Sequence, residues 1–323
     1  MKINTLPRTG LDVSRACMGT MTFGSQAGLA ASQAMVDKCL DAGINFFDTA
    51  NVYNQGRSEE ILGQCLGSER KNVILASKAR GAMGTGPEYV GLSRPAIRRA
   101  IGDSLRRLGT DYLDIYYLHQ PDYETPVEET LDAMEELRRE GKIRYAATSN
   151  HASWQVAEIL WISEKKGYPP PVISQPMYNL LARGIEQEYL PFTRRFQVSV
   201  VSYNPLAGGL LTGKQELSSG PIGGSRFDGN QMYLKRYWHD SYFDAVAALK
   251  ALAAAAGMSL VEMALAWVFH NPDVDSVLLG ASRVEQLEEN LRALERPALS
   301  AEILARCDEV WERLRGVTPK YNR

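Results

Sequence analysis

The chain has 323 residues, a formal net charge of −2 at pH 7 and a pI near 6.2. This balanced charge argues against general affinity for nucleic acid or acidic membranes, and no segment approaches the roughly 18 apolar residues of a membrane span. The N-terminus lacks the apolar stretch of a signal peptide, and the four cysteines are scattered without metal-ligand spacing. We therefore expect a cytoplasmic protein in a reducing compartment, with no metal site.

The first predicted element is a hairpin. Residues 2–6 and 11–13 flank a Pro-Arg-Thr-Gly turn, and we expect this hairpin to close the bottom of the fold. Eight short apolar segments follow, rich in β-branched and aromatic residues, as is typical of strands buried on both faces. In chain order they are residues 17–19, 45–48, 73–78, 114–119, 144–149, 172–175, 198–203 and 276–279.

Helical segments lie between these strands and carry start and stop signals. Residues 125–128, 259–262 and 282–285 each have the spacing of a capping box. Four glycines follow helical segments, where a left-handed C-terminal residue is favoured: Gly109, Gly141, Gly167 and Gly257. Eight strands alternating with helices predict one (β/α)8 TIM barrel domain over residues 1–323, with an open doubly wound sheet as the alternative. The long loop after strand seven, residues 218–240, is expected to cover the rim.

Four titratable side chains follow the ends of predicted strands. Asp48, Lys78 and His119 end the second, third and fourth apolar segments, and Tyr53 lies five residues after Asp48. Because the carboxyl ends of parallel strands meet at one rim, we expect these side chains to converge. A phenol, with a pKa of about 10, transfers protons at neutral pH only if its phenolate is stabilised, as the Lys78 ammonium would do. With Asp48 holding Lys78 and His119 donating to a carbonyl oxygen, the set suits reduction of an aldehyde or ketone.

Three of these residues also have a plainer interpretation when taken singly. Tyr53 alone is more often a packing residue, and His119 alone is more often a satisfied polar residue. Lys78 alone would fit the Schiff-base lysine of a barrel aldolase. Their occurrence together, on consecutive strand–helix units, favours the proton-transfer site.

Several motifs resemble the aldo-keto reductase superfamily. They are DTANVY around Asp48 and Tyr53, the strand that ends at Lys78, YYLHQPD around His119, TSN at 148–150 and GASRVEQLEEN near the end. The resemblance runs from about Leu11 to the last residue. It implies a (β/α)8 barrel that binds a nicotinamide dinucleotide without a Rossmann domain. It also implies that Asp48, Tyr53, Lys78 and His119 form the catalytic tetrad, with Tyr53 as the general acid.

The same resemblance implies a set of positions that bind NADP(H). Ser149, Asn150 and Gln175 match the residues that bind the nicotinamide carboxamide, and Tyr203 matches the ring that stacks on the nicotinamide. The pyrophosphate loop corresponds to Asn204, Leu206, Gly208, Gly209, Leu210 and Lys214, where glycines let backbone amides approach phosphate. The adenosine positions are Gly280, Ser282, Arg283, Gln286, Glu289 and Asn290, and Arg283 with Arg226 favours the 2′-phosphate of NADPH.

Two nucleotide-binding alternatives fit the chain poorly. Residues 208–214 satisfy GxxxxGK, but Gln215 stands where an ATPase needs Ser or Thr to hold magnesium, and Pro205 interrupts the entry to the motif. No GxGxxG follows an early strand, so a Rossmann dehydrogenase is not indicated.

The last hundred residues resemble the aflatoxin aldehyde reductase and succinic semialdehyde reductase branch. The resemblance lies in YNPLAGGLLTGK, SRFDGNQMYLKRYW and the ending KYNR. It implies that Arg236 and Arg323 clamp a substrate carboxylate, with Tyr233 nearby, and that the protein forms a homodimer. His151 and the glycine-rich segment 81–91 depart from the branch pattern. Channel-associated members of the superfamily keep the barrel and bind the cofactor, so a non-catalytic regulatory subunit is the alternative function.

Overall fold

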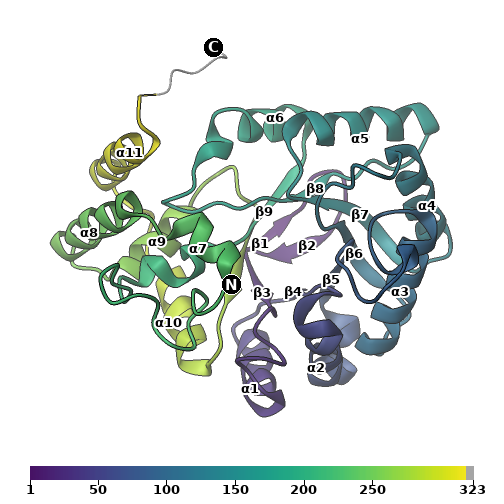
Figure 1. Ribbon diagram of the computed structural model, residues 1–323, viewed down its shortest axis with the longest axis horizontal. Helices are drawn as coiled ribbons and strands as arrows, with labels where there is room; N and C mark the ends of the chain where they lie inside the picture. The colour runs from purple at the N-terminus through teal and green to yellow at the C-terminus, as the bar shows by residue number, and fades with distance from the viewer. Residues whose placement is uncertain (318–323) are drawn as a thin grey trace.

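Eight parallel strands form a closed barrel at the centre of the computed structural model, which describes residues 1–317 (Figure 1). They are β3 Ala16–Gly19, β4 Phe46–Asp48, β5 Ile74–Ala79, β6 Leu113–Leu118, β7 Ile143–Ser149, β8 Ile173–Gln175, β9 Ser199–Ser202 and β10 Ser276–Gly280. Neighbours in the chain are neighbours in the barrel, and β10 pairs with β3 to close it. The predicted (β/α)8 barrel is confirmed, and this closure excludes the open doubly wound sheet.

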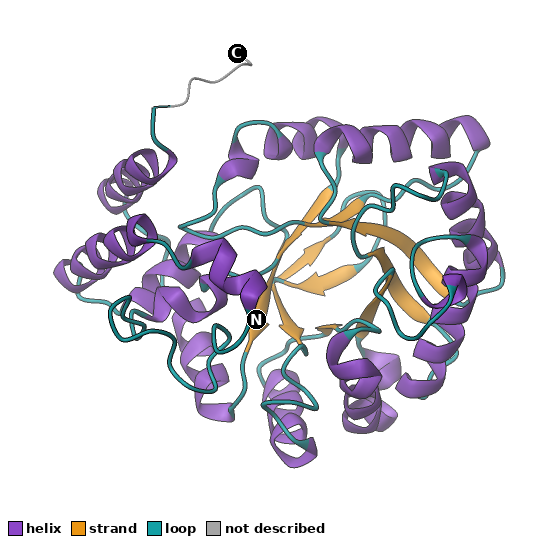
Figure 2. Cartoon of the chain, in the orientation of Figure 1, coloured by secondary structure: helices purple, strands orange, loops and turns teal. Residues whose placement is uncertain are grey.

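Helices surround the barrel (Figure 2). They are α1 Leu29–Asp41, α2 Arg57–Leu66, α3 Arg94–Leu108, α4 Val127–Arg139, α5 Ser153–Lys166, α6 Tyr189–Phe196, α7 Gln231–Tyr237, α8 Asp240–Ala255, α9 Leu260–Phe269, α10 Val284–Leu294 and α11 Ala301–Arg315. Within residues 1–317, no helix by itself has the length and apolar character to cross a membrane. The pair α8 and α9 meets that criterion only jointly, across a bend of 92°.

Side chains of both strand faces are buried. All six residues of β6 are buried, because alternate side chains point into the barrel and toward the helices. The interior cluster contains Phe46, Ile115 and Tyr117, and the predicted hairpin adds Leu6 and Val13 to it. That hairpin consists of β1 Ile3–Thr5 and β2 Asp12–Ser14. Its side chains therefore close the bottom of the barrel, as expected.

Helix ends follow the predictions only in part. The capping box at α9 is present, because Ser259 accepts from the Glu262 amide and Glu262 from the Ser259 amide. The one predicted at residues 125–128 is wrong: α4 begins at Val127, and the Thr125 hydroxyl donates to Asp122 instead, at 2.8 Å. The four predicted glycines do adopt positive φ angles.

The capping box predicted at residues 282–285 is also wrong. The N-cap of α10 is Arg283, and its side chain makes no capping hydrogen bond. The Ser282 hydroxyl donates to Gln286 Oε1 at 3.0 Å, and the Ser282 amide donates to the same oxygen at 2.9 Å. The Gln286 side chain therefore reaches back and accepts hydrogen bonds from Ser282 in place of the capping box.

The long loop predicted at residues 218–240 is more regular than expected, because it contains the short helix α7, whose first turn is capped by Asn230. A 3₁₀ turn, Ala207–Thr212, precedes it. The segment crosses to the loop after β3, where Gln26 Nε2 donates to the Gly224 carbonyl at 2.7 Å. It covers the rim of the barrel, as expected.

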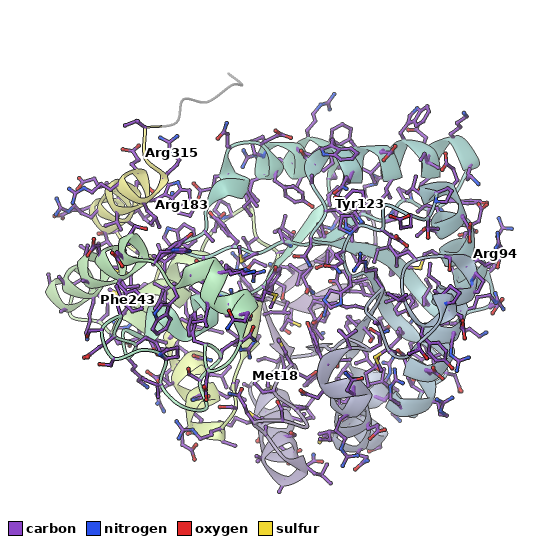
Figure 3. The ribbon with its side chains drawn as sticks, in the orientation of Figure 1. Met18, Arg94, Tyr123, Arg183, Phe243 and Arg315 are labelled. Atoms are coloured by element: carbon purple, nitrogen blue, oxygen red, sulfur yellow. The ribbon has the colours of Figure 1, made fainter. Side chains whose placement is uncertain are left out.

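The last helix lies on the side of the barrel beside α8. Arg183, marked in Figure 3, joins the segment after β8 to α11 through an ion pair with Asp308 at 2.7 Å. Cys307 of α11 is buried, as are Cys17, Cys39 and Cys65, and all four are free thiols.

Candidate active site

The four predicted catalytic side chains lie together at the carboxyl ends of three adjacent strands. Asp48 ends β4, Lys78 lies near the end of β5 and His119 follows β6. Lys78 Nζ donates to Asp48 Oδ1 and to the Thr49 carbonyl, the latter at 2.7 Å, and both charged side chains are fully buried. The same nitrogen lies 5.1 Å from the ring centroid of Tyr53, whose ring meets that of His119 edge-on at 6.0 Å.

A tight turn presents Tyr53 to this cluster. The Tyr53 amide donates to the Ala50 carbonyl at 3.1 Å, and the next two residues, Asn54 and Gln55, have left-handed φ angles of 51° and 57°. Such angles are uncommon for residues other than glycine, although asparagine adopts them more often than most. The Asn54 side-chain amide ties this turn to the loop after β3 by donating to the Met21 carbonyl at 3.0 Å and the Phe23 carbonyl at 2.6 Å.

A chain of polar side chains faces Tyr53 across the rim. Ser149 Oγ donates to the Gln175 carbonyl at 2.9 Å, and Asn150 Nδ2 donates to the His119 carbonyl at 2.9 Å. The Tyr203 hydroxyl donates to Asn150 Oδ1 at 2.7 Å. Each of these side chains is thus held in place by a residue at the end of another strand.

A cavity of about 1250 Å³ opens above these groups. Ligand pockets are typically about 300–1,000 Å³, so this one has room for a large ligand and a small substrate together. Its walls include Asp48, Tyr53 and His119 at one end and the first turn of α10 at the other. Lys78 lies behind Tyr53 and does not line the cavity.

Comparison with known proteins agrees with this geometry. The sequence model of the aldo/keto reductase family matches residues 15–312. The chain belongs to the aldo/keto reductase family. It is 38% identical to the rat protein named aflatoxin B1 aldehyde reductase member 2 over 323 aligned positions, covering 95% of this chain and 87% of that protein. The human protein of that name is also 38% identical, over 95% of this chain and 89% of its own length. A rice protein named probable voltage-gated potassium channel subunit beta is 38% identical over 96% of both chains.

The buried charges of this reductase support one another. Burial alone would lower the pKa of Lys78, but its attraction to Asp48 and Tyr53 raises that pKa above its ordinary value. Burial raises the pKa of Asp48, while Lys78 and Gln175 act in the opposite direction. A protonated, ion-paired and enclosed Lys78 is unsuited to attack a carbonyl. The structure therefore argues against the aldolase alternative.

The electrostatics of Tyr53 differ from the expectation. We expected the Lys78 ammonium to stabilise the Tyr53 phenolate. Lys78 does lower the pKa of the Tyr53 phenol, but burial has the larger effect and raises that pKa above its ordinary value. A buried phenolate loses more hydration than one nearby cation restores. Tyr53 is therefore fully protonated at neutral pH, which is the form that a proton donor requires.

His119 is held neutral. Burial, together with the charges of Lys78 and Arg80, lowers its pKa to about 3. An unfolded histidine takes up a proton below about pH 6.5, so between these values the unfolded chain binds more protons than the folded one. We expect the free energy of unfolding to decrease as the pH falls through this window.

The measurement is urea unfolding from pH 7 to pH 4 for wild type and His119→Asn. The variant should lack up to about 1.4 kcal/mol per pH unit of this decrease. Equal slopes for the two proteins would contradict the assignment.

Nearly all of the predicted cofactor-binding positions line the cavity. Those that do are Ser149, Asn150, Gln175, Tyr203, Asn204, Leu206, Gly208, Gly209, Lys214, Arg226, Gly280, Ser282, Arg283, Gln286, Glu289 and Asn290. Leu210 does not: its side chain is fully buried in the core. Gly208 and Gly209 have φ angles of 69° and 100°, and a side chain on Gly208 would approach Tyr233 to 2.7 Å. This stretch therefore requires glycine, which exposes its backbone to a ligand.

The predicted substrate residues are brought together in part. Tyr233 and Arg236 of α7 line the cavity, and the Arg226 and Arg236 guanidinium carbons lie 5.6 and 5.5 Å from the Tyr233 ring centroid. Arg323 lies outside the described residues.

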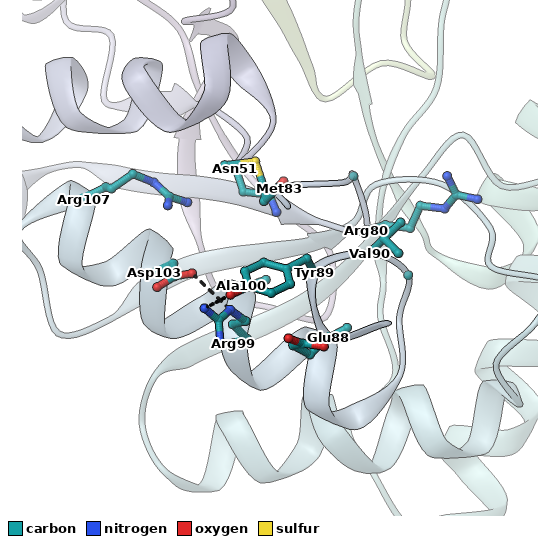
Figure 4. A pocket seen from close by; sticks show the side chains of 13 residues that line it. Asn51, Arg80, Met83, Glu88, Tyr89, Val90, Arg99, Ala100, Asp103 and Arg107 are labelled. Carbon is teal, nitrogen blue, oxygen red and sulfur yellow. Dashed lines mark hydrogen bonds and ion pairs between the residues drawn. The ribbon is translucent and has the colours of Figure 1, made fainter. Parts of the chain in front are cut away.

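A second cavity lies beside the first. It is lined by Asn51, Met83, Tyr89 and Arg107, among others (Figure 4). Its volume is only about 10 Å³, enough for about one water molecule, so it cannot hold a carbonyl substrate.

Several residues at the site were missed by the sequence reasoning. Met21 and Val52 line the cavity near Tyr53. Arg80, with a φ of 120°, lowers the pKa of His119. Met21 and Arg80 lie one or two residues beyond a barrel strand, so the strand-end rule would have found them. Gly81, the first residue of the glycine-rich segment 81–91, also lines the cavity, and a side chain there would lie 1.9 Å from Val52. In the described part of the chain, no group of three or more His, Cys, Asp or Glu residues could hold a metal ion.

Proposed function

We propose that this reductase uses NADPH to reduce short aldehydes and dicarbonyls to alcohols, with Tyr53 as the proton donor. The observation that carries the proposal is the buried Lys78–Asp48 ion pair directly behind Tyr53, at the inner end of the large cavity. Bound NADPH would supply a hydride to the carbonyl carbon. The names of the rat and human relatives, aflatoxin B1 aldehyde reductases, support this class of substrate.

The protein side of the reaction follows from the electrostatics. The Tyr53 hydroxyl gives its proton to the carbonyl oxygen as negative charge develops there. The Lys78 ammonium then stabilises the phenolate that remains, and Asp48 keeps Lys78 charged and fixed. His119 is neutral, so its ring N–H is available to donate to the same oxygen.

We propose that NADPH lies along the cavity from Gln175 to α10. Ser149, Asn150 and Gln175 present polar groups for the nicotinamide carboxamide, and Tyr203 presents its ring for stacking. Gly208, Gly209 and Lys214 would receive the pyrophosphate, since backbone amides and a cation suit an anion. The fit is supported by the size of the cavity and by the open space beside Gly209.

The 2′-phosphate of NADPH should be held by Arg226 and Arg283, which both line the cavity. We expect Arg283→Gln to raise the KM for NADPH by about ten- to a hundredfold, on the scale of one charge-assisted contact. The KM for NADH should change little, because NADH lacks that phosphate. Steady-state kinetics with both cofactors provides the measurement. Comparable affinity of the wild type for NADH and NADPH would contradict the proposed preference for NADPH.

A carboxylate-bearing substrate such as succinic semialdehyde would be selected by Arg236 and Arg323. Arg236 lines the cavity, and its guanidinium fork suits a carboxylate. We expect Arg236→Gln and Arg323→Ala each to raise the KM for succinic semialdehyde at least about tenfold, the cost of one such contact. The KM for the uncharged 2-nitrobenzaldehyde should hardly change. Equal effects on the two substrates would reject the clamp.

The similarity to the rice channel subunit supports a second candidate, a cofactor-binding regulatory barrel. Such a protein would retain NADPH tightly and turn over slowly. Single-turnover and steady-state rates with several aldehydes separate the two candidates. Fast steady-state turnover, lost in Tyr53→Phe, supports the enzyme; slow release of oxidised cofactor after one turnover favours the regulatory subunit.

We further propose that the chain is one domain, acts in the cytoplasm and forms a homodimer. The match of one family across residues 15–312 supports a single domain. Four free thiols are compatible with a reducing compartment. Light scattering of the purified protein tests the dimer.

A further inference from the structure

Gln175 makes a contact that its expected role with the cofactor does not require. Its Nε2 donates to Asp48 Oδ2 at 2.9 Å, on the carboxylate oxygen that Lys78 leaves free. The glutamine is 2% exposed and Asp48 is fully buried. The two residues are 127 positions apart in the chain.

This hydrogen bond spans the mouth of the barrel. Asp48 ends β4 and Gln175 ends β8, and these strands lie four places apart in the closed ring of eight. They therefore face each other across the barrel axis. The Gln175 side chain at the end of β8 therefore holds the Asp48 carboxylate at the end of the opposite strand, β4.

The contact leaves Gln175 able to serve a ligand as well. A primary amide has two N–H donors and one carbonyl oxygen, and Asp48 takes one donor. The carbonyl oxygen remains for the cavity, which Gln175 lines. The same side chain thus joins the polar end of the cavity to the Asp48–Lys78–Tyr53 group.

We propose that Gln175 is a positioning residue for the proton donor, acting through Asp48 and Lys78 as well as facing the nicotinamide. This inference rests on the proposed function. With Oδ2 held by Gln175 and Oδ1 by Lys78, Asp48 has one orientation and fixes the ammonium behind the Tyr53 ring. Loss of the amide donor frees the carboxylate to rotate, so the ammonium no longer faces Tyr53.

The environment of Asp48 makes its charge sensitive to what replaces Gln175. Lys78, Tyr53, Tyr117 and Cys17 are the titratable groups that interact with this carboxylate. Of these only Lys78 is cationic. A second carboxylate at position 175 would therefore face Asp48 with one ammonium between two negative charges, which disfavours ionisation of the Tyr53 phenol.

The first test uses the cofactor-free protein. With 3-fluorotyrosine incorporated at position 53, ¹⁹F NMR follows the titration of that phenol. We expect Gln175→Glu to raise the apparent pKa by roughly one unit, as a nearby like charge does, and Gln175→Met to raise it less. Asn150→Ala removes a nearby side-chain amide that does not contact Asp48. This variant should not change the apparent pKa of the phenol at position 53. Equal titrations in all four proteins would overturn the proposal.

The second test separates positioning from cofactor binding. Gln175→Met should lower kcat by up to about 10²-fold, the cost of a misplaced catalytic group, with a smaller change in the fluorescence-measured Kd for NADPH. Asn150→Ala should raise the Kd for NADPH. A Gln175→Met variant that changes only the Kd would reject the positioning role. A wild type that reduces no aldehyde would defeat the proposed function, while the titration would still decide the role of Gln175.

Discussion

Tyr53→Phe should lose about 10²–10⁴-fold in kcat for aldehyde reduction, the usual contribution of a general acid. The phenyl ring keeps its packing beside Lys78 and His119, so the loss reports the missing hydroxyl proton. Affinity for NADPH, measured by fluorescence in the absence of aldehyde, should stay within a few fold of wild type.

Tyr117 provides a matched control. It is a second phenol beside the same ammonium, with its ring centroid 5.7 Å from Lys78 Nζ, but it is fully buried in the barrel interior and does not line the cavity. Tyr117→Phe should therefore retain most of the wild-type kcat. If Tyr117→Phe loses as much activity as Tyr53→Phe, the proton donor has been assigned to the wrong phenol.

Lys78→Met should abolish most turnover and also destabilise the fold. Removal of one partner of a buried ion pair leaves an uncompensated charge, which costs about 3–5 kcal/mol of unfolding free energy. Asp48 would be that charge, since it is fully buried. Burial already raises its pKa, and losing Lys78 removes the largest opposing effect.

The destabilisation of Lys78→Met should shrink as the pH falls. An acid whose folded pKa lies above its unfolded value is protonated first in the folded state, so acidification relieves the cost. Urea unfolding at pH 5 and pH 8 gives the comparison.

Two further variants complete this test. Asp48→Asn combined with Lys78→Met should regain most of the stability without regaining activity. Lys38→Met, which breaks the exposed pair with Glu288, should change the free energy of unfolding far less, because solvent screens a surface ion pair. If the double variant is as unstable as Lys78→Met, the uncompensated charge is not the cause.

Much of the fold can be predicted from the sequence because its signals are local. A strand buried on both faces appears as a short apolar run, and each predicted run agrees with an observed strand to within one residue at either end. The strand-end rule then places Asp48, Lys78 and His119 at one rim without any knowledge of their contacts. To predict the position of these residues, it is enough to know that successive strands pair in parallel. Short strand–helix repeats impose that pairing.

Other features depend on which of several possible partners a side chain contacts once the chain has folded. Thr125 and Ser282 each have the sequence of a capping residue, yet Asp122 and Gln286 take their hydroxyl groups. Leu210 lies in a loop that resembles a phosphate-binding segment, but its side chain is in the core. A local sequence pattern shows which hydrogen bonds are possible, but it does not show which partner a side chain contacts in the folded protein.

The sequence alone determined the barrel, the order of its strands and the residue types gathered at the rim. Only the tertiary structure decided how those residues behave there. Tyr53 stays protonated because burial outweighs the nearby ammonium, and His119 stays neutral because it is enclosed beside two cations. Gln175 reaches Asp48 because closure places opposite strands face to face. Burial and distance across a closed barrel are properties of the whole fold, so no segment of the sequence contains them.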